Sequence, residues 1–197
     1  TMSLNKPIKF GFVRGPVWNF GAEDMKNGIE EFVKNAQLDI EELDLGKDFD
    51  DAAKAHEIIM NGSIAYSLMN YYQTDKSNLH PFTIKRIEAG IPVSASDYVS
   101  AIEQAKKMEQ ILKQFFKKYD AIITPAAPGQ APRDLMNTGN AIFNGYWTMM
   151  GVPAISLPFL KGRDNLPIGI QFIANWNEDL KLLEICKEVL KKEKLAD

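Results

Sequence analysis

The spacing of hydrophobic and polar positions changes several times along the chain, and these changes predict an α/β protein. Residues 8–13 form a short apolar run that ends at Arg14-Gly-Pro, and residues 39–45 alternate, so both segments read as strands. Between them, residues 22–35 carry apolar positions at helical spacing, with two acids in the first turn. A strand, a helix and a strand within about 40 residues favour a βαβ unit with parallel pairing.

The middle of the chain, residues 50–119, is predicted to be helical. Ser94 and Asp97 have the spacing of a capping box, and apolar positions then keep a 3.6-residue period as far as Tyr119. The remainder mixes strands and helices. It is predicted to comprise a strand over 121–124, a proline-rich loop over 125–132, a helix over 140–150 that ends at the Gly151-Val-Pro break, strands over 154–157 and 167–174, and an amphipathic helix over 178–192.

Composition and charge narrow the range of partners. The 197 residues carry a net charge of −3, with basic residues scattered among acids, so we expect no nucleic-acid partner. No apolar run approaches the roughly 18 residues of a membrane span, so we expect no membrane contact. The single cysteine, Cys186, excludes an intrachain disulfide, which favours a cytoplasmic location. Cys186 lies on the apolar stripe of the last helix, where we expect a buried spacer.

The histidines, glycines and tyrosines that could suggest catalysis or cofactor binding are better explained by structural roles. His56 and His80, the only histidines, have no partner at i+3 or i+4, so we expect packing roles and no metal. The segment Gly11-Phe-Val-Arg-Gly15 lacks the G-x-G-x-x-G spacing, so we expect no cofactor. No G-x-S-x-G nucleophile motif is present. Three tyrosines at helical spacing either line a cleft or pack in the core, and we expect the core: Tyr66, Tyr71 and Tyr72.

Three segments in the last third of the chain resemble the amidase signature family. They are "YDAIITPAAPGQAP" (119–132), "TGNAIFNGYWTMMGVPAISLPF" (138–159) and "LPIGIQFIA" (166–174), and their order and spacing are similar to the C-terminal half of those enzymes. The resemblance implies an α/β fold with a mixed sheet flanked by helices, of which residues 5–197 form the C-terminal portion only. Residues 1–4 read as a cloning scar.

The resemblance also implies hydrolysis of carboxylic amides by a serine, a second serine in a cis peptide, and a lysine. The Gly/Ser-rich run that carries the two serines is not found in this sequence, so we expect no catalytic residue in it. The sequence therefore favours an amidase-family hydrolase whose Ser-cis-Ser-Lys catalytic segment is absent from this chain. The alternative is a non-catalytic α/β binding or partner subunit that retains the pocket wall.

Four residues are candidates for a substrate pocket. The predicted helix over 140–150 places Phe143 and Trp147 four positions apart on one face, beside Asn144, which suits an acyl or leaving-group pocket; ordinary core packing is the alternative. Gln171 interrupts an apolar strand, where burial of its amide requires hydrogen-bond partners, so we expect it to orient groups near the site. We expect Phe143, Asn144 and Trp147 to border the largest apolar concavity, with Gln171 nearby.

The expected partners follow from the missing half. In the complete enzyme the ligand is a small amide substrate. Removal of half of a layered domain uncovers a sheet edge and apolar helix surface. We therefore expect a homodimer, or the missing N-terminal half, to cover this surface.

Overall fold

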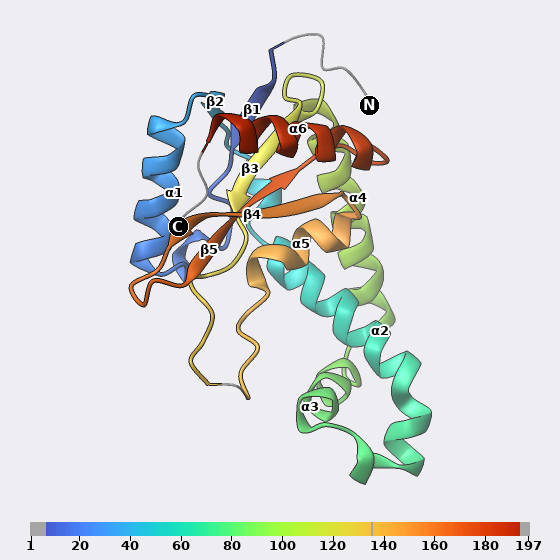
Figure 1. Cartoon of the computed structure of the whole chain (residues 1–197). Helices are drawn as coiled ribbons and strands as arrows, with labels where there is room; N and C mark the ends of the chain where they lie inside the picture. Colours follow the sequence, from blue (N-terminus) through green and yellow to red (C-terminus); the bar gives the residue numbers. More distant parts are fainter. Residues whose placement is uncertain (1–6, 135, 194–197) are drawn as a thin grey trace.

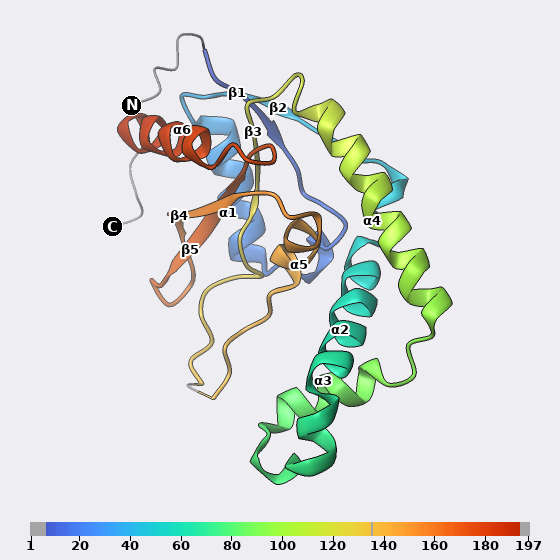
Figure 2. The ribbon, with the colours of Figure 1, turned by 90° about the vertical axis from the view of Figure 1, so that its right-hand side faces the viewer.

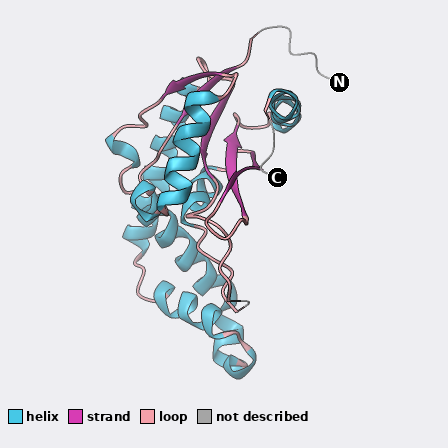
Figure 3. Ribbon diagram, turned by 60° about the vertical axis from the view of Figure 1, so that its left-hand side comes forward, coloured by secondary structure: helices cyan, strands magenta, loops and turns pink. Residues whose placement is uncertain are grey.

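The computed structural model describes residues 7–134 and 136–193, so the expectation about residues 1–4 lies outside them. The chain forms a five-stranded mixed sheet with helices on both sides of the strands (Figures 1 and 3). This arrangement confirms the α/β prediction. The elements are β1 (Lys9–Phe12), α1 (Glu23–Asn35), β2 (Asp39–Glu42), α2 (Ala52–Thr74), α3 (Pro81–Gly90), α4 (Ala95–Phe115), β3 (Ala121–Pro125), α5 (Ile142–Met150), β4 (Ala154–Lys161), β5 (Pro167–Ile173) and α6 (Asp179–Lys192).

The order of strands across the sheet is β2-β1-β3-β5-β4. Strand β1 pairs in parallel with β2, as the βαβ pattern predicts, and it also pairs in parallel with β3. Strand β5 then pairs antiparallel with both β3 and β4, which makes the sheet mixed. Strand β4 ends the sheet, and its exposed side chains (Ala154, Ser156, Pro158) alternate with half-buried ones. One long edge strand is thus left without a second neighbour among the described residues.

Strand β4 is longer than the predicted 154–157 because the sheet continues through Pro158. The pairing register shifts between Leu157 and Leu160, which marks an irregularity in the ladder. A proline cannot donate to a ladder and is tolerated mainly on edge strands and at bulges. Both conditions hold here, so the proline does not end the strand.

An aromatic cluster lies against the face of the sheet that α1 covers. Phe10 and Phe172 meet edge to face with ring centroids 6.2 Å apart, and Phe159 stacks on Phe32 of α1 at 5.1 Å. Ring pairs of this kind stabilise a core beyond the area that they bury. This packing fixes α1 against β4, the strand at the edge of the sheet.

The helices of the middle region project from the sheet as an arm. Helices α2 and α4 run side by side away from the strands, and α3 lies at the far end (Figures 1 and 2). The helical arm is defined here as residues 61–100. Its α4 begins at Ser94, whose Oγ accepts from Asp97 N at 3.0 Å, which confirms the predicted cap. The helix ends at Phe115, earlier than predicted, and residues 116–119 form turns.

Candidate functional site

Helix α5 carries three of the four predicted pocket residues. Phe143 and Trp147 share its buried face, and both are at most 1% exposed. The helix stops at Gly151, whose φ of 68° is left-handed and suits glycine, and the following Val-Pro leads into β4. The side-chain amide of Asn144 donates from Nδ2 to the carbonyl of Ala126 at 3.0 Å. This bond ties α5 to the loop that leaves β3.

Gln171 lies in the middle of β5. Its register partners are Thr124 on β3 and Ser156 on β4, so these three side chains share one face of the sheet. Tyr146 of α5 faces Thr124 on that side, and its ring centroid is 4.7 Å from that of Trp147. The structure thus brings α5 and Gln171 to the same face.

The layer between α5 and β5 contains unpaired polar atoms. Four buried side-chain atoms in the described residues have no hydrogen-bond partner: Thr124 Oγ1, Tyr146 Oη, Trp147 Nε1 and Gln171 Nε2. Burial raises the pKa of Tyr146, so its hydroxyl stays protonated. Burial of the Gln171 amide was expected to require hydrogen-bond partners. Within the described part of this chain, its Nε2 has none.

The other side of α5 borders a polar cleft that no pattern in the sequence predicts. The cleft, hereafter the α5 cleft, has a volume of about 470 Å³. It is bordered by α2, by α3 and by the N-terminal end of α5. Its charged lining residues are Lys54, Glu57 and Arg86, and His56 adds an imidazole. Side chains from three helices therefore converge on one cavity.

His56 depends on the absence of a side chain at Gly145. A Cβ at Gly145 would lie 2.6 Å from Nδ1 of the imidazole, which is closer than any real contact. The pKa of His56 is lowered, first by burial and then by the positive charge of Arg86. His56 is therefore neutral near pH 7, with one nitrogen that donates and one that accepts.

Arg86 reaches the cleft from α3. Its Nη1 donates at 3.3 Å to Glu57 Oε1 and at 3.3 Å to Asn61 Oδ1, both on α2. Its side chain remains 29% exposed, so other donors of the guanidinium are free to meet a ligand. With Lys54, the cleft holds two cationic groups against one carboxylate. This surplus favours an anionic ligand group.

No local spacing in the sequence marks this constellation. His56 was assigned a packing role, and Arg86 occurs within a helical segment without a motif of its own. The fold brings them together, because α2 packs against both α3 and α5. His80 caps α3 by accepting at Nδ1 from Phe82 N at 3.2 Å, and it lies outside the cleft.

Two predictions about other side chains have clear outcomes. Tyr66 is 90% exposed and Tyr71 is 56% exposed, so the expectation that they lie in the core is wrong. They lie on the part of α2 that extends beyond the sheet, where no layer of the described structure covers their face. Cys186 is buried as predicted, and burial raises the pKa of its thiol to about 12.

Two negative findings apply only to residues 7–134 and 136–193. No helix there is long and apolar enough to cross a membrane. No group of three or more histidine, cysteine, aspartate or glutamate side chains there is placed to hold a metal ion.

The fold and the cleft define a mixed α/β protein with a polar cavity between its helices. The family model for amidases matches residues 3–183, which is most of the chain. The chain therefore belongs to the amidase family, and its homologues and structural neighbours are amidase signature enzymes.

Two curated relatives illustrate the similarity. A glutamyl-tRNA(Gln) amidotransferase subunit from Aliarcobacter butzleri (strain RM4018) is 34% identical over 125 residues, covering 58% of this chain and 28% of that protein. A fatty acid amide hydrolase of Medicago truncatula is 31% identical over 110 residues, covering 50% of this chain and 18% of that protein. The chain thus spans under a third of the length of these relatives.

Solved structures show the same fold over nearly the whole chain. A crystal structure of an amidase superposes with a TM-score of 0.83 at 17% identity, covering 94% of this chain and 45% of that one. A glutamyl-tRNA(Gln) amidotransferase subunit from Thermotoga maritima gives a TM-score of 0.66 at 22% identity, covering 95% and 43%. About half of each solved fold has no counterpart in these residues.

Proposed function

We propose that this chain forms the substrate-holding part of an amide hydrolase and that the Ser-cis-Ser-Lys catalytic group comes from polypeptide outside these residues. The observation that carries the proposal is the α5 cleft, where Arg86, Lys54 and neutral His56 converge beside a conformationally fixed helix. Membership of the amidase family supports the reaction class. Amide hydrolysis requires a positioned substrate in addition to a nucleophile.

The substrate class follows from the charges in the cleft. Arg86 presents a planar fork of donors that suits a carboxylate, and Lys54 adds a second positive charge. We infer that the cleft takes an amide whose other end carries a carboxylate. The neutral imidazole of His56 adds either a donor or an acceptor for the amide group.

The four sequence-predicted residues have supporting roles in this proposal. Phe143 and Trp147 fill the space beneath α5 and hold the helix against the sheet. Asn144 fixes the helix to the loop after β3. Gln171 faces the same layer from β5, and its unpaired Nε2 is available to orient a group there.

The open edge of β4 is the proposed docking surface for the missing part. An unpaired edge strand presents backbone donors and acceptors that another strand can satisfy. Relatives of this chain include proteins named as subunits of an amidotransferase, and one solved neighbour is described as belonging to a vestigial protein complex. The occupant is the complementary half of the domain or a second copy of this chain.

A binding measurement tests the cleft. Isothermal titration should show that succinamate, an amide with a carboxylate, binds more tightly than propionamide, which has no charge. Arg86→Gln should weaken succinamate binding by about 10-fold or more, since hydrogen bonds to charged groups contribute about 1.5–3 kcal/mol. Lys85→Gln, at an exposed neighbouring position outside the cleft, is the matched control and should change little.

Two outcomes decide against the cleft as a substrate site. One is equal affinity for the charged and the neutral amide. The other is succinamate binding that Arg86→Gln leaves unchanged while the variant remains folded. Binding that behaves as expected in a chain that is never found with a catalytic partner would favour the alternative, a non-catalytic binding subunit.

A further inference from the structure

A second and larger groove lies in the helical arm, between α2, α3 and α4. Its volume is about 700 Å³. Small-molecule sites usually range from about 300 to 1,000 Å³. None of the residues that line the groove also lines the α5 cleft. The groove is therefore a separate feature that the proposed function does not use.

The floor of the groove is built by close approach of the helices. Gly62 lets the ring of Tyr98 lie against α2, because a Cβ there would be 3.0 Å from a ring carbon. Gly90 brings the end of α3 against α2, because a Cβ there would be 2.0 Å from the carbonyl oxygen of Asn61. The shape of the floor thus depends on two glycines on separate helices.

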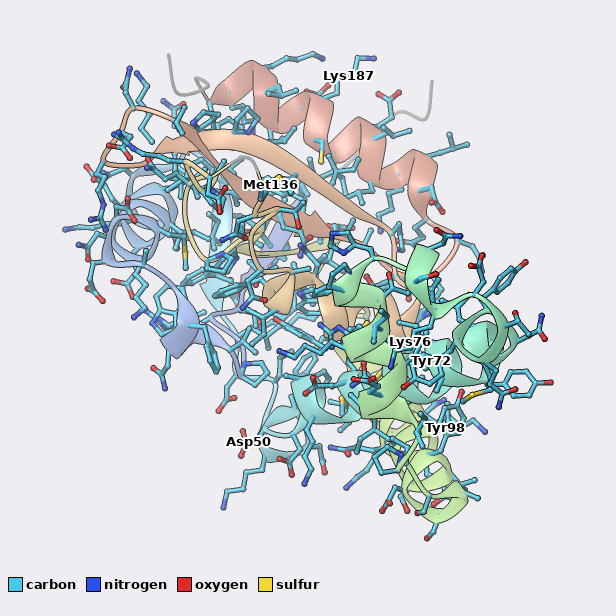
Figure 4. All side chains as sticks on the ribbon, turned by 90° about the horizontal axis from the view of Figure 1, so that it is seen from below. Asp50, Tyr72, Lys76, Tyr98, Met136 and Lys187 are labelled. Atoms are coloured by element: carbon cyan, nitrogen blue, oxygen red, sulfur yellow. The ribbon has the colours of Figure 1, made fainter. Side chains whose placement is uncertain are left out.

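The lining is uncharged, and two of its hydroxyls form a hydrogen-bonded pair. Ser63 Oγ and Tyr98 Oη lie 3.0 Å apart, and both side chains are half-buried. One hydroxyl donates to the other, which leaves one hydrogen and several lone pairs for a ligand. Figure 4 shows Tyr98 in the arm, among the side chains of the neighbouring helices.

The rim of the groove exposes large apolar side chains. Tyr66 is 90% exposed, Ile91 52% and Val99 54%, and all three line the groove. Apolar side chains that gather around a concavity mark binding surfaces more often than isolated ones do. A charged ligand would find no counter-charge in this lining, so charge complementarity selects a neutral one.

We propose that the groove of the helical arm binds an uncharged small molecule with an apolar, ring-sized body and one hydrogen-bonding group. The body lies between Tyr66, Ile91 and Val99, and the hydrogen-bonding group meets the Ser63–Tyr98 pair. The proposal is independent of the α5 cleft. It adds a second ligand site to this chain.

Two neutral probes test the two parts of the site by ¹⁹F NMR titration. 4-Fluoroacetanilide has an amide, and 4-fluorotoluene has no hydrogen-bonding group of comparable strength. We expect saturable binding of both probes. Tyr98→Phe should lower the affinity for 4-fluoroacetanilide by roughly 2- to 10-fold, which corresponds to the loss of one net hydrogen bond. It should leave the affinity for 4-fluorotoluene unchanged.

Two variants of exposed tyrosines test the rim of the groove. One is expected to lose affinity for the probes, and the other is the control. Tyr66→Ala should weaken both probes, and because Tyr66 is highly exposed the variant should fold normally. Tyr71→Phe changes an exposed tyrosine of α2 outside the groove and should alter neither affinity. Arg86→Gln should also leave both affinities unchanged, which separates this test from that of the α5 cleft.

Three results would overturn the proposal. They are the absence of saturable binding by either probe, unchanged affinities in Tyr66→Ala, and equal losses for both probes in Tyr98→Phe. Sedimentation supplies a further test. The wild-type chain could form a dimer that Tyr66→Ala dissociates but that neither probe dissociates. That result would show that a second copy occupies the groove.

Discussion

At the scale of single residues, His56 shows how a neighbouring helix determines a side chain's chemistry. Its ring occupies the space left by the missing side chain of Gly145, and the surrounding protein lowers its pKa. Arg86 lies close enough to contribute to that shift and also pairs with Glu57. Replacement of Arg86 or Glu57 by a neutral residue therefore alters the charge around His56.

The lowered pKa of His56 predicts a pH dependence of stability. Unfolded His56 binds a proton near its ordinary pKa of 6.5, whereas the folded protein binds it only at lower pH. Between the pKa of His56 in the folded protein and its pKa of about 6.5 in the unfolded chain, the unfolded state binds more protons. The folded state is therefore stabilised above about pH 6.5, and this stabilisation is lost as the pH falls through the folded pKa.

Chemical unfolding of the wild type and of His56→Gln at several pH values between about 7.5 and 5 measures this effect. The wild-type free energy of unfolding should fall more steeply with decreasing pH than that of the variant. Parallel slopes for the two proteins would contradict the assignment.

Tyr146 predicts an unusual effect of removing a hydroxyl. Thr124 and Trp147 lie next to its buried Oη, but none of the described residues makes a hydrogen bond of good geometry with it. Tyr146→Phe should therefore leave the free energy of unfolding unchanged or raise it by up to ~1 kcal/mol. Tyr119→Phe is the matched control, because Tyr119 Oη donates to Glu41 Oε2 at 3.0 Å. The control should lose about 0.5–1.5 kcal/mol. A comparable loss in Tyr146→Phe would show that its hydroxyl is bonded.

At the scale of elements, two helical glycines predict opposite effects of the same substitution. In Gly28→Ala the added methyl would meet Leu160 methyls at 3.4 Å, an ordinary contact, and alanine favours the helix by about 0.5–1 kcal/mol. In Gly90→Ala the methyl would press on the Asn61 carbonyl, so α3 must move away from α2. Overpacking of this kind costs about 1–3 kcal/mol or more.

Denaturant titrations of the two variants check these signs. Gly28→Ala should be more stable than the wild type, and Gly90→Ala should be less stable. Gly90→Ala with wild-type stability would mean that α3 is not held against α2 as the structure shows.

The elements themselves were largely predictable because their signals are local. Period, caps and turns placed α1, α4, α5, α6 and all five strands, and they predicted a helical middle region without separating α2 from α3. The parallel pair β1–β2 followed from the βαβ pattern. The extension of β4 through Pro158 was not predictable, because only its edge position and its irregular register make the proline tolerable. Burial of Tyr66 and Tyr71 was wrongly expected because helical spacing does not show where the covering layer ends.

The candidate site, like the fold, was predictable from the sequence only in part. Phe143, Asn144 and Trp147 were located on a helix from the sequence, yet Phe143 and Trp147 are fully buried, and the larger groove, in the helical arm, is lined by other residues. The convergence of His56, Arg86 and α5 depends on the packing of α2 against both α3 and α5. No motif encodes such contacts, so only the folded chain reveals the α5 cleft.

At the scale of the whole molecule, the exposed face and open edge of β4 predict association. We expect a species larger than the monomer at micromolar concentration, unless the complementary half of the domain is present. A lysine on an edge strand opposes strand pairing. Ser156→Lys, on the exposed face of β4, should therefore weaken self-association by roughly 10-fold or more, whereas Ser96→Lys on exposed α4 should not.

Sedimentation velocity over a concentration series provides the readout for this surface. Equal dissociation constants for Ser156→Lys and the wild type would place the interface elsewhere. A strictly monomeric wild type would show that the edge is stable in water, and it would favour the non-catalytic alternative.

The most direct test of the central claim is a turnover assay on this 197-residue chain. The claim is that these residues hold an amide substrate while the nucleophile lies on other polypeptide. Simple aliphatic and aryl amides, together with succinamate, should therefore release ammonia or amine only at the uncatalysed rate, even when succinamate saturates the α5 cleft. Turnover that a single serine substitution in this chain abolishes would contradict the account.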